Sequence, residues 1–510
     1  MDKFSQSQAK AGVMSSEQNV YLGIDAGTQS LKLLAYDAGQ KEILHVSAAP
    51  LELISRDDGS REQIADWWLH ALRQCMNELP AEIKKRVRGI GVSGQQHGFV
   101  PLNSAGEVIA PVKLWCDTST IPECDEITAR FGGAERCIDA VGNPILPGYT
   151  APKILWLKKN SPEAYAELAH ILLPHDYLNF FLTGRIYTEY GDASGTGYLN
   201  ILRREYDRAM LAAIDPDRDL LPLLPPIYEA GSTVALSAKV AGEFDLPNEV
   251  HVSTGGGDNM MAAFGTGSIA PGVLTMSLGT SGTLFAYSDK PAIDPNGELA
   301  AFCSSNGGWL PLQCTMNCTV ATETTRRMLG KSIAECEQLL EESRPGADGL
   351  ISLPFYSGER TPNLPHARAS LHGMTDSNTT AANLCRAAME GATFTLRRGL
   401  DALNRAGQQF TAIRLTGGGA KSPHWRQMIA DVFNLPVEVP AQQEGAAFGA
   451  AMQALWSCGG AGEDLCALTV EHLTLDKSLG CTPDRDTAAA YQTHYQQFLD
   501  LLSQQYPQIH

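Results

Sequence analysis

The chain has 510 residues, of which 44% are hydrophobic and 19% charged, which is typical of a folded protein and excludes a largely disordered one. Its 39 Lys and Arg residues against 57 Asp and Glu residues give a net charge of −18, which argues against nucleic-acid binding through a broad basic surface. There is no run of ~18 apolar residues for a membrane span and no apolar signal-peptide core, so we expect a cytoplasmic protein without a membrane partner. Residues 1–19 are predicted to form a flexible polar tail.

The first part of the chain alternates strand and helix signals, which favours an α/β fold. Residues 20–37 are predicted to form two short strands around a Gly-Thr-Gln-Ser turn. Apolar residues at helical spacing predict a helix within residues 61–79. Residues 88–94 form a short apolar strand that ends in a glycine turn. The residues of the first turn are Gly27, Thr28, Gln29 and Ser30.

The same strand–turn–strand pattern returns about 250 residues later. Residues 274–289 contain an apolar strand, a second turn with Gly279 and Thr280, and another apolar strand. Two copies of one unit predict two similar lobes. We place them at residues 20–250 and 251–510.

The last large signal lies between residues 413 and 456. A strand ends in three glycines, Gly417–Gly419, and Ser422 and Pro423 suit the N-cap and first position of a following helix. A strand at 436–439, a helix of small residues around 445–455 and an amphipathic helix over 486–506 complete the prediction.

The glycine turns are candidate phosphate sites, because successive backbone amides in a tight turn form a concave anion site to which hydroxyls add donors. Each turn alone is more simply an ordinary hairpin, but their repetition favours two turns that hold a triphosphate between the lobes. Gly418, Gly419 and Ser422 precede a helix, whose N-terminus can receive a phosphate or the polar edge of a nucleotide.

Two aspartates are the candidate catalytic groups. Asp25 precedes the first turn and can bind Mg²⁺, although it also suits a turn cap. Asp258 follows three glycines, and its carboxylate can accept a proton from a substrate hydroxyl or cap a helix. Asn259 follows it directly. Gln96 and His97 come after a predicted strand, where α/β folds place ligands, and can bond sugar hydroxyls, although a lone histidine is more often structural.

Two further predictions concern an ion pair and the cysteines. Glu359 and Arg360 are expected to form a structural ion pair within a loop. The twelve scattered cysteines are expected to be free thiols, with Cys314 and Cys318 as buried apolar side chains rather than metal ligands.

Together these segments resemble the FGGY carbohydrate kinases of the actin/hexokinase/Hsp70-like ATPase superfamily. Within that family they are most similar to the bacterial xylulose-phosphorylating kinases. The matching segments are residues 23–32, 91–98, 142–157, 172–184, 192–199, 255–267, 277–286, 353–362 and 416–440. The resemblance implies an α/β protein of two ribonuclease-H-like lobes, with ATP, Mg²⁺ and a ketopentose bound in a cleft between them.

By motif position, the resemblance implies that Asp258 is the general base that takes the proton of the 5-hydroxyl of D-xylulose. Asp25 would hold Mg²⁺, and the sugar would contact Gln96, His97, Asp258 and Asn259. Phosphates would contact Thr28, Gly279 and Thr280. The nucleoside would lie at Gly418, Gly419 and Ser422. Lobe closure on sugar binding is also implied, and a homodimer is among the implied assemblies.

The chain departs from the family pattern at two sugar-side positions. Gln96 stands where the xylulose-phosphorylating members often have Met, and residues 114–120 lack the Arg that often follows Trp-x-Asp. Kinases for ribulose, gluconate, glycerol or sedoheptulose therefore stay as alternatives. So do an actin- or Hsp70-like ATPase and a sugar-sensing regulator without catalysis.

Overall fold

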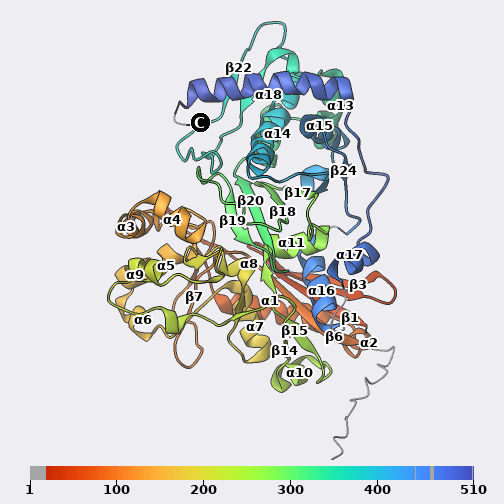
Figure 1. The fold of residues 1–510 in the computed structure, drawn as a ribbon. Coiled ribbons are helices and arrows are strands. Elements are labelled where there is room, and N and C mark those ends of the chain that lie inside the picture. The colour runs from red at the N-terminus through yellow and green to blue at the C-terminus, as the bar shows by residue number, and fades with distance from the viewer. Residues whose placement is uncertain (1–18, 443, 460–463, 508, 510) are drawn as a thin grey trace, which may run out of the picture.

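The computed structural model describes residues 19–442, 444–459, 464–507 and 509, and it shows two lobes, one above the other in Figure 1. The predicted tail, apart from residue 19, lies outside the described residues. Among the helices of the described part, none is both long and apolar enough to cross a membrane. All twelve cysteines are free thiols, as predicted.

The lower lobe is built on a seven-stranded sheet in the order β14-β15-β6-β1-β2-β3, with β16 beside β6. Strands β1, β2 and β3 are antiparallel, whereas β6 and β15 run parallel to β1. The predicted first turn therefore joins β1 to β2. The strands are β1 Val20–Ala26, β2 Ser30–Asp37, β3 Glu42–Pro50, β6 Val87–Gly94, β14 Thr233–Ala235, β15 His251–Ser253 and β16 Gly256–Gly257.

The upper lobe is built on a six-stranded sheet in the order β19-β20-β18-β17-β23-β24. Strands β17, β18 and β20 are antiparallel, and β23 and β24 run parallel to β17 and to each other. The path β3-β2-β1-β6-β15 of the lower lobe thus reappears as β20-β18-β17-β23-β24, which confirms two lobes of ribonuclease-H-like topology. The strands are β17 Val273–Leu278, β18 Gly282–Ala286, β19 Ala300–Cys303, β20 Trp309–Thr315, β23 Ala412–Thr416 and β24 Val437–Glu438.

Helices cover both sheets. The first predicted helix begins only at Ala65, because residues 61–63 form a strand instead. The early helices are α1 Ala65–Glu78, α2 Ala81–Lys84, α3 Ile121–Phe131, α4 Ala134–Val141, α5 Thr150–Asn160, α6 Pro162–Glu167, α7 Pro174–Thr183, α8 Tyr190–Ala193, α9 Arg208–Ile214 and α10 Ala238–Phe244. The later ones are α11 Asp258–Thr266, α12 Thr319–Met328, α13 Ile333–Glu342, α14 Ala381–Arg405, α15 Pro423–Phe433, α16 Gly445–Cys458, α17 Leu465–His472 and α18 Arg485–Gln505.

Short strands and 3₁₀ turns form the connections, and several of them lie near the site described below. They are β4 Ile54–Ser55, β5 Arg61–Gln63, β7 Val100–Leu102, β8 Val112–Lys113, β9 His170–Leu172, β10 Thr188–Glu189, β11 Leu199–Asn200, β12 Glu205–Tyr206, β13 Ile227–Tyr228, β21 Ile351–Leu353, β22 Ser370–His372, η1 Leu221–Leu223, η2 Ala347–Gly349 and η3 Gly418–Lys421.

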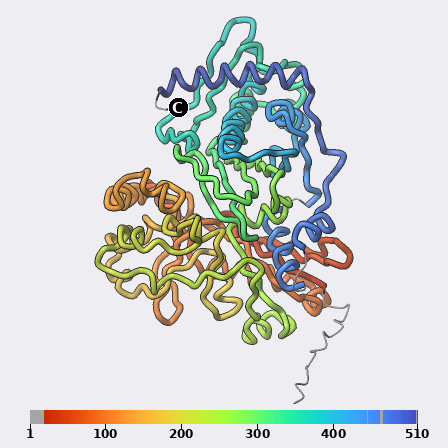
Figure 2. Tube along the Cα trace, viewed as in Figure 1, coloured from red at the N-terminus to blue at the C-terminus, as the bar shows by residue number. Residues whose placement is uncertain are grey.

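The small-residue helix α16 crosses from the upper lobe back to the lower sheet, where Figure 2 shows the blue late chain beside the red early chain. It packs on β1, β6 and α11. A Cβ atom at Gly449 would lie 1.7 Å from the Met261 carbonyl oxygen, and one at Gly23 would lie 1.8 Å from the Ala447 carbonyl oxygen. Glycine at these positions therefore lets backbone contact backbone, and α11 is held between the lobes.

Candidate active site

Asp25 lies on β1, and its carboxylate faces the end of the neighbouring parallel strand. The Ser93 hydroxyl donates a 2.8 Å hydrogen bond to Asp25 Oδ1. Burial raises the pKa of Asp25, against the lowering effects of that bond and of Lys32. Lys32 itself pairs with Glu444, Nζ to Oε2 2.5 Å, so its charge is already partly compensated.

Asp258 is the first residue of α11, immediately after β16. Gly257, not Asp258, holds the N-cap position, so the alternative of a capping aspartate is wrong. The Asp258 carboxylate accepts bonds from the backbone and side-chain nitrogens of Asn259, at 2.8 and 3.0 Å. Burial, together with the nearby negative charge of Asp25, raises the pKa of Asp258 to about 7. A carboxyl group with this pKa exchanges a proton near neutral pH.

Gln96 lies beside Asp258 and Asn259. Its Oε1 accepts a 2.8 Å bond from Asn259 Nδ2, which joins two segments that are 163 residues apart. The other polar end, Gln96 Nε2, is buried and has no hydrogen-bond partner among the described residues. A Cβ at Gly257 would lie 2.6 Å from Gln96 Cγ, so the last glycine before Asp258 is required for this approach.

His97 has an unusual backbone, with φ of +63° in the left-handed region, which costs a non-glycine residue about 1–2 kcal/mol. Its ring lies against Tyr149 and Phe302, with ring centroids 4.9 and 5.5 Å away. Burial lowers the pKa of His97 well below its ordinary value, and the charges of Lys153 and Arg360 add to this effect. The ring is therefore neutral, and its buried Nδ1 has no partner within the described chain.

The first glycine turn uses some of its polar groups internally. The Gly27 amide donates to the Ser30 carbonyl, and the Thr28 hydroxyl donates to Gln95 Oε1 at 3.0 Å while accepting from Trp115 Nε1 at 3.0 Å. The expected hydroxyl donor is thus already engaged. Over the described residues, the backbone amides of Thr28 and Gln29 in this turn donate no hydrogen bond within the chain.

The second glycine turn presents its amides in the same way. The carbonyls of Gly279 and Thr280 accept bonds from the amides of Thr319 and Cys318, which fixes the turn against the start of α12. In the part of the chain that the structure describes, the amides of Gly279 and Thr280 have no acceptor. Both turns therefore offer backbone donors suited to an anion.

A cavity of about 470 Å³ opens beside the third glycine segment. Gly418, Gly419 and Ser422 line it, together with residues of α12, α13 and α14. The predicted cap is confirmed, because Ser422 Oγ accepts a 3.1 Å bond from the Trp425 amide at the start of α15. The volume suits a nucleoside. Sequence reasoning missed the other polar lining residues, of which Thr319, Glu323 and Arg326 face this cavity.

The predicted ion pair between Glu359 and Arg360 is wrong. Glu359 is buried and accepts from the Met316 amide at 2.6 Å, from Asn317 Nδ2 at 3.0 Å and from the backbone amide of Arg360 at 2.8 Å. Glu359 thus ties its loop to the segment before α12. The Arg360 side chain instead lines a second cavity of about 320 Å³, together with Tyr149 of the other lobe.

The residues present fit a divalent cation bound together with a phosphate. No group of three His, Cys, Asp or Glu side chains that would hold a metal is found in the described part of the chain. Asp25 and Asp258, however, are two nearby carboxylates whose negative charges repel each other. Mg²⁺ is commonly held by one or two carboxylates and completed by substrate phosphates, so this donor set suits it.

Comparison with known proteins finds one family that matches both lobes. The model of the FGGY family of carbohydrate kinases, N-terminal domain, matches residues 20–265, and that of the C-terminal domain matches residues 274–458. A protein named xylulose kinase from Haemophilus influenzae is 44% identical over 496 residues, covering 96% of this chain and 100% of the relative. One of the same name from Streptomyces coelicolor is 37% identical over 440 residues, 86% of this chain and 88% of the relative.

Solved structures show the same fold. A crystal structure titled as a xyloylose kinase from Brucella ovis has a TM-score of 0.88 at 31% identity, covering 96% of this chain and 99% of that one. A gluconate kinase from Lactobacillus acidophilus has a TM-score of 0.88 at 24% identity, covering 94% of this chain and 97% of that one, a likeness of fold alone.

Proposed function

Because the chain belongs to the FGGY family of carbohydrate kinases, we propose that it transfers the γ-phosphoryl group of ATP to the 5-hydroxyl of D-xylulose. The products are D-xylulose 5-phosphate and ADP. The observation that carries the proposal is the cluster of Asp258, Asn259 and Gln96, in which a proton-exchanging carboxyl group adjoins amides suited to sugar hydroxyls. The family makes ATP the phosphoryl donor and a small sugar the acceptor.

Asp258 acts as the general base. Its carboxylate takes the proton of the 5-hydroxyl as that oxygen attacks the γ-phosphorus in line, with ADP as the leaving group. Gln96 Nε2, His97 Nδ1 and the Asn259 side chain hold the other hydroxyls of the sugar. The unpartnered buried nitrogens of Gln96 and His97 support this role, since each gains a hydrogen bond when a polyhydroxylated ligand binds.

The two glycine turns hold the phosphates through the backbone amides of Thr28, Gln29, Gly279 and Thr280. The nucleoside occupies the cavity at Gly418, Gly419 and Ser422. Asp25 holds Mg²⁺, which when bound neutralises phosphate charge. This arrangement explains how a chain of net charge −18 binds a polyanion without a basic surface.

The proposal extends to properties that follow from the family rather than from this site. We infer that the lobes close on the sugar, that the protein works in the cytoplasm, and that two copies form a homodimer. The division of the chain into lobes at residue 250 also stays a prediction.

The test is ADP release measured with D-xylulose, D-ribulose, L-ribulose, gluconate, glycerol and sedoheptulose as acceptors. We expect the largest kcat/KM with D-xylulose and negligible ATP hydrolysis without sugar. Faster turnover of another acceptor would replace xylulose as the substrate. Sugar-independent hydrolysis would instead favour an actin- or Hsp70-like ATPase, and sugar binding without turnover would indicate a sensor.

A further inference from the structure

Lys153 is a buried lysine on α5 that the proposed chemistry does not use. The residue has no exposed surface, and its Nζ donates two hydrogen bonds, to the carbonyl oxygens of His97 and Gly148, each at 2.7 Å. Neither acceptor is a carboxylate. The amino group of Lys153 therefore bonds two backbone carbonyls rather than forming an ion pair.

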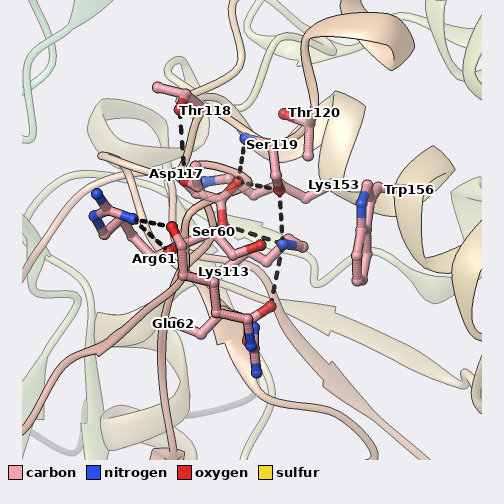
Figure 3. Close-up of polar contacts among 12 residues, drawn as sticks. Ser60, Arg61, Glu62, Lys113, Asp117, Thr118, Ser119, Thr120, Lys153 and Trp156 are labelled. Carbon is pink, nitrogen blue, oxygen red and sulfur yellow. Dashed lines mark hydrogen bonds and ion pairs between the residues drawn. The ribbon is translucent and has the colours of Figure 1, made fainter.

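The neighbouring acids are already compensated by another lysine. Figure 3 shows Lys113 at the centre of a cluster beside Lys153 and Trp156, with contacts to Asp117, Ser119 and Glu62. Lys113 Nζ lies 3.1 Å from Asp117 Oδ2, 2.9 Å from Ser119 Oγ and 3.1 Å from Glu62 Oε1. Asp117 thus has a direct partner of its own and faces Lys153 only at longer range.

This arrangement makes Lys153 costly as a purely structural residue. Burial lowers its pKa to about 7, partly offset by the negative charge of Asp117, while Lys113 opposes protonation. An apolar side chain of similar size would avoid that desolvation. What an apolar side chain would lose is the pair of bonds to His97 and Gly148.

Those two carbonyls belong to the backbone that carries the His97 and Tyr149 rings. The backbone of His97 is left-handed, and its carbonyl accepts from Lys153 at 2.7 Å and from Thr150 Oγ1 at 3.2 Å. Gly148 directly precedes Tyr149, whose ring packs against that of His97. Lys153 therefore connects both residues of the His97–Tyr149 ring pair.

We propose that Lys153 is a positioning residue for the sugar site, because its bonds to the His97 and Gly148 carbonyls hold the His97 ring where it meets the acceptor sugar. This inference rests on the proposed function, in which His97 binds a sugar hydroxyl. Loss of the two bonds lets His97 relax toward an ordinary backbone conformation, which turns the ring away from Tyr149. Sugar affinity then falls, while the ATP site and Asp258 stay intact.

The first variant is Lys153→Met, which keeps the volume of the side chain and removes both donors. We expect KM for the sugar, and its Kd by calorimetry without ATP, to rise at least tenfold. We expect kcat and KM for ATP to stay within about twofold of wild type. A folded Lys153→Met protein with unchanged sugar KM overturns the proposal, and so does a parallel change of all three parameters.

Milder and matched variants separate positioning from stability. Thr150→Val removes the third bond to the same carbonyl with almost no change of shape, and we expect sugar KM to rise two- to fivefold. This variant decides the question if Lys153→Met does not fold, and an unchanged KM then overturns the proposal. Lys158→Met, on the same helix, loses ion pairs to Asp215 and Asp217 and none of the bonds to the two carbonyls, so it is expected to lower stability without changing sugar KM.

The acceptor that the wild type prefers separates failure of the proposed substrate from failure of the positioning role of Lys153. If wild type prefers an acceptor other than xylulose, the proposed substrate is wrong, and the variants are measured with the preferred acceptor. A rise of KM for that acceptor in Lys153→Met supports the positioning role independently of the substrate. A wild-type protein that binds no sugar overturns both.

Discussion

Asp258 is the residue on which the proposed chemistry depends most directly. Replacing it by Asn keeps the shape and removes the proton acceptor, so kcat should fall by about 10²–10⁴-fold. The variant should be at least as stable as wild type at pH 8, because a half-buried carboxylate whose pKa is raised by desolvation disfavours the folded state when it is ionised.

Turnover and thermal unfolding of Asp258→Asn measured on the same preparation check this prediction. Activity within tenfold of wild type would contradict the assignment of the base. A folded, inactive protein that still binds xylulose would support it.

The raised pKa of Asp258 also predicts the pH dependence of the reaction. The carboxyl group titrates near pH 7 in the folded protein rather than near 3.8, so the basic form is lost as the pH falls through 7. We expect kcat/KM for the sugar to decrease tenfold per pH unit below that value and to level off above it. Rates at constant ionic strength between pH 5.5 and 9 measure it, and a flat profile down to pH 6 would contradict the prediction.

At the scale of elements, α16 decides where α11 and therefore Asp258 lie. Gly449→Ala places a Cβ 1.7 Å from the Met261 carbonyl, so the helices must separate. Overpacking of this kind costs about 1–3 kcal/mol, more than the ~1 kcal/mol that Ala adds to helix stability. We expect a lower urea midpoint together with reduced kcat.

Gly242→Ala is the matched control, because Gly242 is exposed on α10 and no atom lies within 4 Å of the added Cβ. It should raise stability by about 0.5–1 kcal/mol and leave activity unchanged. Equal effects of the two substitutions would show that the close contact of α16 with α11 does not position the site.

At the scale of the whole molecule, each lobe has its own apolar core, and a third cluster joins them. That cluster includes Met261 and Phe264 of α11, Phe448 of α16 and Phe302 of β19. The lobes are thus connected through α11 and α16 beside the proposed site, and a hinge at this place would change the distance between the lobes. We expect the radius of gyration, measured by small-angle X-ray scattering, to decrease when D-xylulose is added.

An acceptor that gives no turnover in the substrate test serves as the control ligand, at the same concentration. No change with any accepted sugar would contradict closure. A decrease with ATP alone would place the trigger at the nucleotide cavity instead.

The sequence by itself determined the elements whose signals are local. Neighbouring residues encode the paired strands around the Gly-Thr turns and the Ser422 cap, because turn and cap preferences act over only a few positions. The repeated lobe could be predicted because its strand–turn–strand unit is such a local pattern. Family motifs, which are also local, predicted a carbohydrate kinase. They also predicted the candidate site residues Asp25, Asp258, Gln96 and His97.

Tertiary structure decided the partners. Glu359 accepts a bond from the Met316 amide and, within the described chain, forms no ion pair with the side chain of its neighbour Arg360. The Thr28 hydroxyl donates to Gln95, and Lys153 donates to the carbonyl of the left-handed His97. Each of these contacts joins residues 43 to 67 positions apart, and a buried polar group takes whichever partner the fold brings within reach. Residue order alone does not specify that choice, since it depends on how two sheets and α16 pack together.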